Sequence, residues 1–124
     1  MLLAVILVAR TQGPRSRSAE VLDLQNPIPA TRESLEIGER LYRAQCQICH
    51  GAAGAGNGPA AAGLNPRPVD FRVHAAVGHT DGQLFDWITN GFEGTAMPAY
   101  KNTLSEDQRW HLVNFIKSLA LSDR

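Results

Sequence analysis

The sequence predicts an all-α domain with one long loop. Apolar residues recur at helical spacing in three segments, strand patterns are weak throughout, and the stretch between the first two segments is rich in Gly, Ala and Pro. Only 6% of the 124 residues are aromatic. A small domain with so few large side chains needs a further source of core, so we expect the loop to wrap around a large flat ligand.

The charge of the chain excludes one class of function. Twelve Lys and Arg residues balance twelve Asp and Glu residues, which leaves a formal net charge of zero. Nucleic-acid binding depends on a positive field that neutralises phosphates. The chain is therefore not expected to bind nucleic acid.

The N-terminal region is predicted to lie outside the domain. Residues 1–9 (MLLAVILVA) are apolar without interruption, but a membrane-spanning helix needs about 20 such residues. No basic residue precedes the run and no cysteine follows it directly, so three interpretations stay open: a clipped signal peptide, the end of a truncated membrane helix, or a hydrophobic plug in an assembly. We favour a residual export or anchor segment. Residues 10–33 contain Gly13-Pro14 and Asn26-Pro27-Ile28-Pro29 and are interpreted as an extended linker.

The domain itself is predicted to cover residues 34–121. Its first helix spans residues 34–45, where apolar or small residues fall on one helical face. These residues are Leu35, Gly38, Leu41, Tyr42 and Ala44.

Two further helices are marked by their caps. Residues 80–91 open with Thr80 and Gln83 at the spacing of a capping box and close at Gly91. Residues 105–119 repeat that spacing with Ser105 and Gln108, and acidic residues in the first turn suit the helix dipole. The buried stripe of this last helix is Leu112, Phe115, Ile116 and Leu119.

The chain's only two cysteines lie in the run Cys46-Gln47-Ile48-Cys49-His50, the spacing of covalent c-type haem attachment. Two thiols three residues apart can form thioethers to the two vinyl groups of one porphyrin, and the following imidazole can reach the iron. A redox disulfide would be expected in a βαβ context, which is missing here. A structural zinc site would need four ligands, and no second cysteine pair exists. The run therefore predicts one haem c bound through Cys46 and Cys49, with His50 as an iron ligand.

Met97 is the candidate for the second iron ligand. Apart from Met1 it is the only methionine, and it lies in a loop 47 residues after His50, next to Pro98. A lone methionine is more often core filler, but a thioether opposite an imidazole is the His/Met ligation that raises haem potential in cytochromes c. A bis-histidine haem is the alternative, and its candidates are His74, His79 and His111.

These motifs together resemble single-haem class I cytochromes c over roughly residues 26–119. The resemblance implies a small helical shell around one haem, in which the first and last helices cross. A glycine allows such helices to approach closely, so Gly38 and Tyr42 are expected to meet Leu112 and Phe115. The matching runs are Gly38-x-x-x-Tyr42, Cys46-x-x-Cys49-His50-Gly51, Gly54-x-Gly56-x-Gly58-Pro59, Leu64-x-Pro66-x-Pro68-x-Asp70-Phe71, Gly91, Gly94-Thr95-x-Met97-Pro98 and Leu112-x-x-Phe115.

The resemblance also implies residues that support the haem. In the family, a proline carbonyl in the loop after the haem motif accepts the Nδ1 hydrogen of the proximal imidazole, which fixes the ring and raises its basicity. Pro59 is the candidate and Pro66 the alternative, because this loop departs from the mitochondrial pattern. Leu64, from the same region, is assigned to the haem-binding residues.

Aromatic and basic side chains are further candidates for haem contact. Trp87 and Tyr100 are expected to reach a haem propionate or the Met97 sulfur, with ordinary packed aromatics as the alternative. Arg67 and Arg72 are candidates to neutralise propionates, although solvated surface arginines are commoner.

With both axial positions filled, no iron site is left for oxygen or peroxide. We therefore predict one-electron transfer, with no small-molecule substrate and no enzymatic activity of the chain itself. The alternative is a haem peroxidase or gas sensor in which Met97 is labile. The exposed haem edge is expected near Ala52, Ala53 and residues 60–63, where redox proteins of an electron-transport chain would form small interfaces, below ~1,200 Å².

The lead-in Asn26-Pro27-x-Pro29 resembles cytochrome domains tethered to bacterial respiratory or photosynthetic complexes. Together with residues 1–9, it favours a subunit attached to such a complex, with integral membrane subunits as candidate partners, over a freely diffusing periplasmic carrier. Thioether attachment takes place outside the cytoplasm in bacteria. The resemblance therefore implies the periplasm or the outer face of the cytoplasmic membrane.

Overall fold

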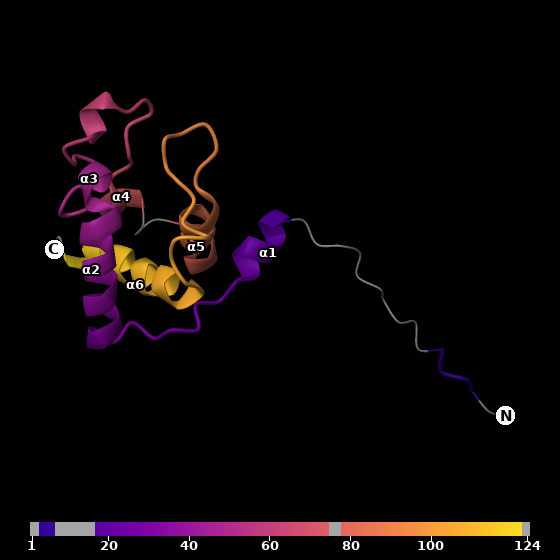
Figure 1. The fold of residues 1–124 in the computed structure, drawn as a ribbon. Coiled ribbons are helices and arrows are strands. Elements are labelled where there is room, and N and C mark those ends of the chain that lie inside the picture. Colours follow the sequence, from indigo (N-terminus) through magenta and orange to yellow (C-terminus); the bar gives the residue numbers. More distant parts are fainter. Residues whose placement is uncertain (1–2, 7–16, 75–77, 123–124) are drawn as a thin grey trace.

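The all-α prediction is confirmed. The computed structural model describes residues 3–6, 17–74 and 78–122, and within these ranges it contains helices and no strand. Figure 1 shows α2 crossing α6. Helix α3 lies above the crossing, α5 lies to the right of α2 in this view, and α1 lies farther to the right, beyond α5. The elements are α1 (Arg17–Asp23), α2 (Arg32–Gln45), α3 (Gln47–His50), η1 (Ala61–Gly63), α4 (Phe71–His74), α5 (Asp81–Asn90) and α6 (Glu106–Ser122).

The predicted caps are present. The Thr80 hydroxyl accepts from Gln83 N at 3.1 Å while Thr80 N donates to Gln83 Oε1 at 2.9 Å, which completes the capping box of α5. Ser105 and Gln108 form the same pair of bonds ahead of α6. Helix α2 begins two residues earlier than predicted, because the Thr31 hydroxyl caps it by accepting from Ser34 N.

The crossing of α2 and α6 holds the largest part of the core. A Cβ atom on Gly38 would overlap the carbonyl oxygen of His111 and lie 2.7 Å from Phe115 Cβ, so only glycine allows this approach. The Tyr42 and Phe115 rings meet with centroids 5.1 Å apart. The expected contacts of Gly38 and Tyr42 with Phe115 are confirmed, and Leu112 belongs to the same core cluster as Tyr42. The buried apolar residues of the core cluster are Tyr42, Leu84, Phe85, Ile88, Leu104, Trp110, Leu112, Val113 and Ile116.

The segment before α2 is fixed to this core by a polar network. The amide of Asn114, a buried residue of α6, donates to the Ile28 carbonyl at 3.0 Å and to the Ser34 hydroxyl at 2.9 Å. Its oxygen accepts from Asn26 Nδ2 at 2.8 Å. The last part of the predicted linker is thus part of the folded domain.

The extended linker predicted over residues 10–33 is also interrupted by a helix. Helix α1 packs on α5, and a Cβ on Gly82 of α5 would overlap the Val21 carbonyl oxygen. Arg17 forms an ion pair with Asp86 at 3.0 Å. Helix α1 forms through contacts with residues that are distant in the sequence, and the spacing of apolar residues does not indicate such contacts. Residues 10–16 lie outside the described ranges.

Only residues 3–6 of the apolar N-terminal run are described, and they are exposed and not helical. Among the described residues, no helix is long and apolar enough to cross a bilayer. The predicted loop over residues 51–78 is confirmed in its described part except for two short elements, η1 and α4, of which α4 packs on α6.

Candidate functional site

The haem-attachment run forms a single helical turn at the end of α2. Both Cys49 N and His50 N donate to the Cys46 carbonyl, at 3.2 and 2.9 Å. Gly51 follows with a φ of +86°, a value that favours glycine and lets the chain leave the turn sharply. Cys46 and Cys49 are free thiols. The backbone therefore presents two thiols and one imidazole within five residues, as the motif predicts.

Burial sets the protonation of these groups. It raises the pKa of the Cys46 thiol to about 12, with a smaller contribution from the neighbouring Cys49. Burial also lowers the pKa of His50, which favours the neutral imidazole that can bind a metal. The His50 ring stacks on Phe71, with centroids 4.6 Å apart. Phe71 ends the run from Leu64 to Phe71 that resembles class I cytochromes c, but the sequence predicted no role for it.

The predicted bond from His50 Nδ1 to a proline carbonyl is not formed in this structure. This buried nitrogen has no hydrogen-bond partner in the described part of the chain. The loop after the motif instead folds back on α3, where Gly58 N donates to the Cys49 carbonyl and Ala60 N to the Ile48 carbonyl. These two bonds hold Pro59 between them at the surface. Leu64, partly buried, follows η1 directly.

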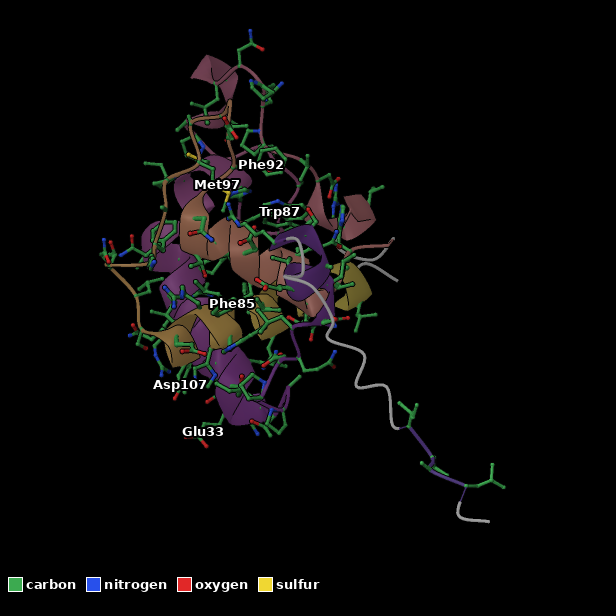
Figure 2. All side chains as sticks on the ribbon, turned by 90° about the vertical axis from the view of Figure 1, so that its right-hand side faces the viewer. Glu33, Phe85, Trp87, Phe92, Met97 and Asp107 are labelled. Atoms are coloured by element: carbon green, nitrogen blue, oxygen red, sulfur yellow. The ribbon has the colours of Figure 1, made fainter. Side chains whose placement is uncertain are left out.

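Met97 lies in the loop between α5 and α6. Figure 2 shows it near Trp87 and Phe92 at one end of the molecule. Met97 is partly buried and packs against the same core cluster as Cys46, Trp87 and Tyr100. Its backbone N donates to the Thr95 hydroxyl at 3.2 Å. The two predicted iron ligands are thus in different segments, both of which adjoin one core.

Tyr100 connects these two segments. Its hydroxyl donates to the Gln45 carbonyl at 3.0 Å, one residue before Cys46. Burial first, and then Cys46 and Cys49, raise the pKa of Tyr100. The hydroxyl proton of Tyr100 is thus used by the backbone in this structure, and a contact of Tyr100 with a propionate or with the Met97 sulfur stays a prediction.

The Trp87 ring is surrounded by other rings. It meets His79 edge-on at 4.9 Å between centroids and Phe92 at 5.4 Å. This arrangement matches the packed-aromatic alternative, and no bond to the Met97 sulfur is seen for Trp87 in the described part of the chain.

The remaining polar candidates have other neighbours. Arg72 forms a two-pronged ion pair with Asp70, with bonds of 3.0 and 2.8 Å. Arg67 is exposed. His111 Nδ1 lies 2.7 Å from the Ser34 hydroxyl at the crossing of α2 and α6, so this nitrogen is occupied. The side chain of His74 lies outside the described residues.

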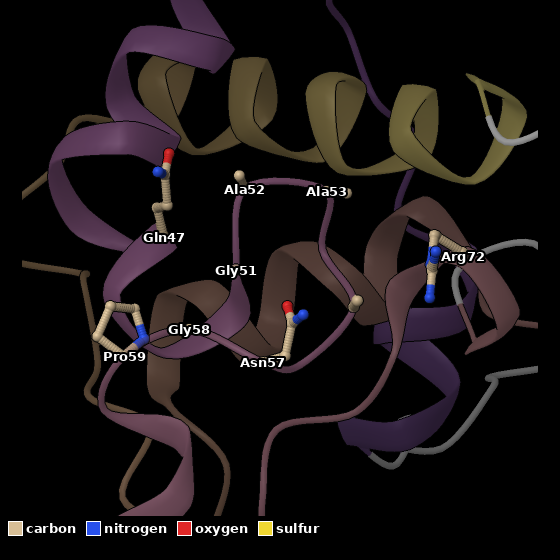
Figure 3. A pocket seen from close by; sticks show the side chains of 9 residues that line it. Gln47, Gly51, Ala52, Ala53, Asn57, Gly58, Pro59 and Arg72 are labelled. Atoms are coloured by element: carbon tan, nitrogen blue, oxygen red, sulfur yellow. The ribbon is translucent and has the colours of Figure 1, made fainter.

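A hollow of about 450 Å³ lies beside α3 and the loop that follows it (Figure 3). Gln47, Asn57, Pro59 and Arg72 line it together with small residues of the loop. Ala52 and Ala53 are exposed at its edge. The contact rim predicted around these two alanines is therefore accessible, whereas Ala61, predicted in the same rim, is buried.

The residues present fit a haem c. The donor set comprises two free thiols, a partly buried imidazole of lowered pKa, and a thioether on a separate loop that packs against the same core cluster as Cys46. A zinc site finds no support, because the described residues contain no group of three or more His, Cys, Asp or Glu side chains that could hold a metal ion.

Comparison with known proteins agrees with a c-type cytochrome domain. One solved structure, a chain of the Kuenenia stuttgartiensis reducing HAO-like protein complex Kustc0457/Kustc0458, is 29% identical with a TM-score of 0.68. The match covers 77% of this chain and 49% of that one, so this chain spans about half the length of that relative. No curated protein matches. The family model for cytochrome c oxidase, cbb3-type, subunit III matches residues 33–116. The chain belongs to this family of c-type cytochrome domains.

Proposed function

We propose that this protein transfers single electrons through one haem c, bound to Cys46 and Cys49 by thioethers and ligated by His50 and Met97. The observation that carries the proposal is the connection between the two ligand segments. Tyr100, three residues after Met97, donates its hydroxyl to the residue that precedes Cys46. Two segments separated by about fifty residues are thereby held around one site.

The chain's own residues would perform distinct tasks at this site. The two cysteines would hold the porphyrin at the end of α2, and burial favours the neutral form of the His50 imidazole that would bind the iron. Met97 would supply the second iron ligand from its loop, which would leave no open position for exogenous ligands. The bound haem supplies a one-electron couple whose potential is raised by His/Met ligation.

The proposal extends to the setting in which the domain works. The cytochrome domain would work as a subunit or tethered carrier that passes electrons to other redox proteins, on the periplasmic or outer face of a bacterial cytoplasmic membrane. Support comes from membership in a family described by an oxidase subunit, and from similarity to part of a protein complex. Residues 1–9 would supply the attachment.

Replacement of Met97 by alanine tests the ligation. In Met97→Ala, the charge-transfer absorption between methionine sulfur and ferric iron should vanish, the reduction potential should fall, and the reduced protein should bind carbon monoxide at neutral pH. Glu93→Ala, an exposed change in the same loop, serves as the matched control and should behave like the wild type.

Two outcomes would separate the alternatives. An unchanged potential together with an unchanged charge-transfer absorption in Met97→Ala would show that Met97 is not a ligand. Carbon monoxide binding by the unmodified reduced protein would instead favour the peroxidase or gas-sensor interpretation. A reduced-minus-oxidised spectrum with haem quantitation measures the number of haems per chain.

A further inference from the structure

We propose that Tyr100 is a positioning residue that keeps Met97 on the iron. This inference rests on the proposed His/Met ligation and adds a residue and a bond to it. The bond joins the Tyr100 hydroxyl to the Gln45 carbonyl at 3.0 Å, and Gln45 is the last residue of α2 before Cys46. It thus connects the loop of one ligand directly to the segment of the other.

The backbone of Tyr100 is itself held on a third element. Tyr100 N donates to the Ile88 carbonyl at 2.9 Å and Lys101 N to the Thr89 carbonyl at 3.0 Å, both near the end of α5. The carbonyl of Tyr100 accepts from Leu104 N at 2.9 Å. Residue 100 is therefore a fixed point, from which the side chain spans to the end of α2.

The segment before Tyr100 lacks comparable anchors among the bonds seen in the structure. Thr95 N donates to the Phe92 carbonyl at 3.2 Å and Met97 N to the Thr95 hydroxyl at 3.2 Å. These bonds join residues of the same short loop and do not connect it to α2 or α3. Loops with few contacts to the rest of a protein open most easily. The Tyr100 side chain is therefore the link that limits how far this loop can move from Cys46.

Tyr42 provides a matched control. Its hydroxyl also donates to a backbone carbonyl, that of Gly51, at 2.6 Å. This bond lies on the His50 side of the site, however, and does not involve the loop of Met97. The Tyr→Phe change removes the same hydroxyl at each position and keeps the ring. Of these two bonds, the one from Tyr100 crosses between the two ligand segments.

The test compares Tyr100→Phe and Tyr42→Phe in the full-length ferric protein with its haem. Exogenous imidazole competes with Met97 for the iron, and its apparent affinity rises with the fraction of molecules whose loop has opened. For the loss of one hydrogen bond we expect this affinity to rise roughly three- to tenfold in Tyr100→Phe. In Tyr42→Phe it should stay within about twofold of the wild type, while resistance to guanidinium unfolding falls because the buried Gly51 carbonyl loses the shorter of its two hydrogen bonds and keeps the one from Gly54 N.

The outcomes distinguish this inference from the proposed function. If wild-type protein shows no methionine-to-iron absorption that imidazole can displace, the His/Met ligation is wrong and the inference fails with it. If the wild type shows that absorption but Tyr100→Phe binds imidazole like the wild type, the ligation stands and the positioning role is overturned. An equal rise in both variants would also overturn it, because the effect would then follow from general destabilisation.

Discussion

Two helix contacts in this protein depend on a glycine, and they differ in what they bury. Gly38 lets α2 approach α6, and Gly82 lets α5 approach α1, since a Cβ at either position would overlap a backbone carbonyl oxygen. The first contact encloses Tyr42 and Leu112, which are almost wholly inaccessible to solvent. Helix α1 contributes no buried residue, and its ion pair with Asp86 uses a largely exposed arginine.

The difference shows that close approach and stability are separate properties. A glycine at a helix contact indicates that two backbones lie close together, whereas the free energy that the contact contributes to folding depends on the apolar area removed from water. Exposed ion pairs of the kind seen between Arg17 and Asp86 contribute about 0–1 kcal/mol. The family match begins at residue 33 and so includes the first contact but not α1. Helix α1 is accordingly expected to separate from the domain without unfolding it.

The largest effect is expected for Gly38→Ala. The new methyl group must displace the backbone at His111 and the Phe115 side chain. Overpacking of this kind costs about 1–3 kcal/mol, and this site belongs at the upper end because the overlapped atom is a backbone oxygen. After the gain of roughly 1 kcal/mol in helix propensity, guanidinium unfolding followed by haem absorbance should give an unfolding free energy lower by about 2 kcal/mol. Gly63→Ala is the control, because a Cβ there meets nothing within 4 Å. Equal stability of the two variants would contradict the tight crossing.

A loss of about 1–2 kcal/mol is expected for Asn114→Ala. This change leaves the buried Ser34 hydroxyl and the Ile28 carbonyl without the amide that donates to them. The variant tests whether residues 26–31 belong to the folded domain or to the N-terminal part that is expected to separate with α1. Unfolding free energy should fall, and amide hydrogen exchange at Ile28 should speed up. Asn90→Ala removes a bond to Asp86 at an exposed position and should leave both measurements near wild type.

The smallest effect on global stability is expected for Gly82→Ala. Its Cβ would displace the carbonyl of Val21, so α1 should leave α5. Because no residue of α1 is fully buried, the unfolding free energy should change by less than about 1 kcal/mol. Amide exchange across residues 17–24 should become fast, whereas exchange in α6 stays slow. A loss of global stability as large as that of Gly38→Ala would show that α1 is an integral part of the core.

Patterns that involve neighbours in the sequence were predictable. The capping box at Thr80, the end of α5 at Gly91 and the single turn from Cys46 to His50 all depend on residues a few positions apart. The crossing at Gly38 was also predictable, but only because the resemblance to a known family supplied the arrangement of the helices.

Contacts between distant segments were not predictable from one sequence. Nothing local indicates that Phe71 stacks on His50, that Asn114 binds Ile28 and Ser34, or that Arg17 pairs with Asp86. The short helix α1 belongs to the same group, because seven residues form a stable helix only through tertiary contacts.

The sequence by itself determined the chemistry: two thiols and an imidazole on one turn, and a thioether in a loop beyond them. These properties follow from residue identity and short spacing, which the chain carries before it folds. Only the tertiary structure decided which group each polar side chain contacts. The hydroxyl of Tyr100 reaches the end of α2, and not the sulfur of Met97, because the packing of α5 against the core fixes where residue 100 lies.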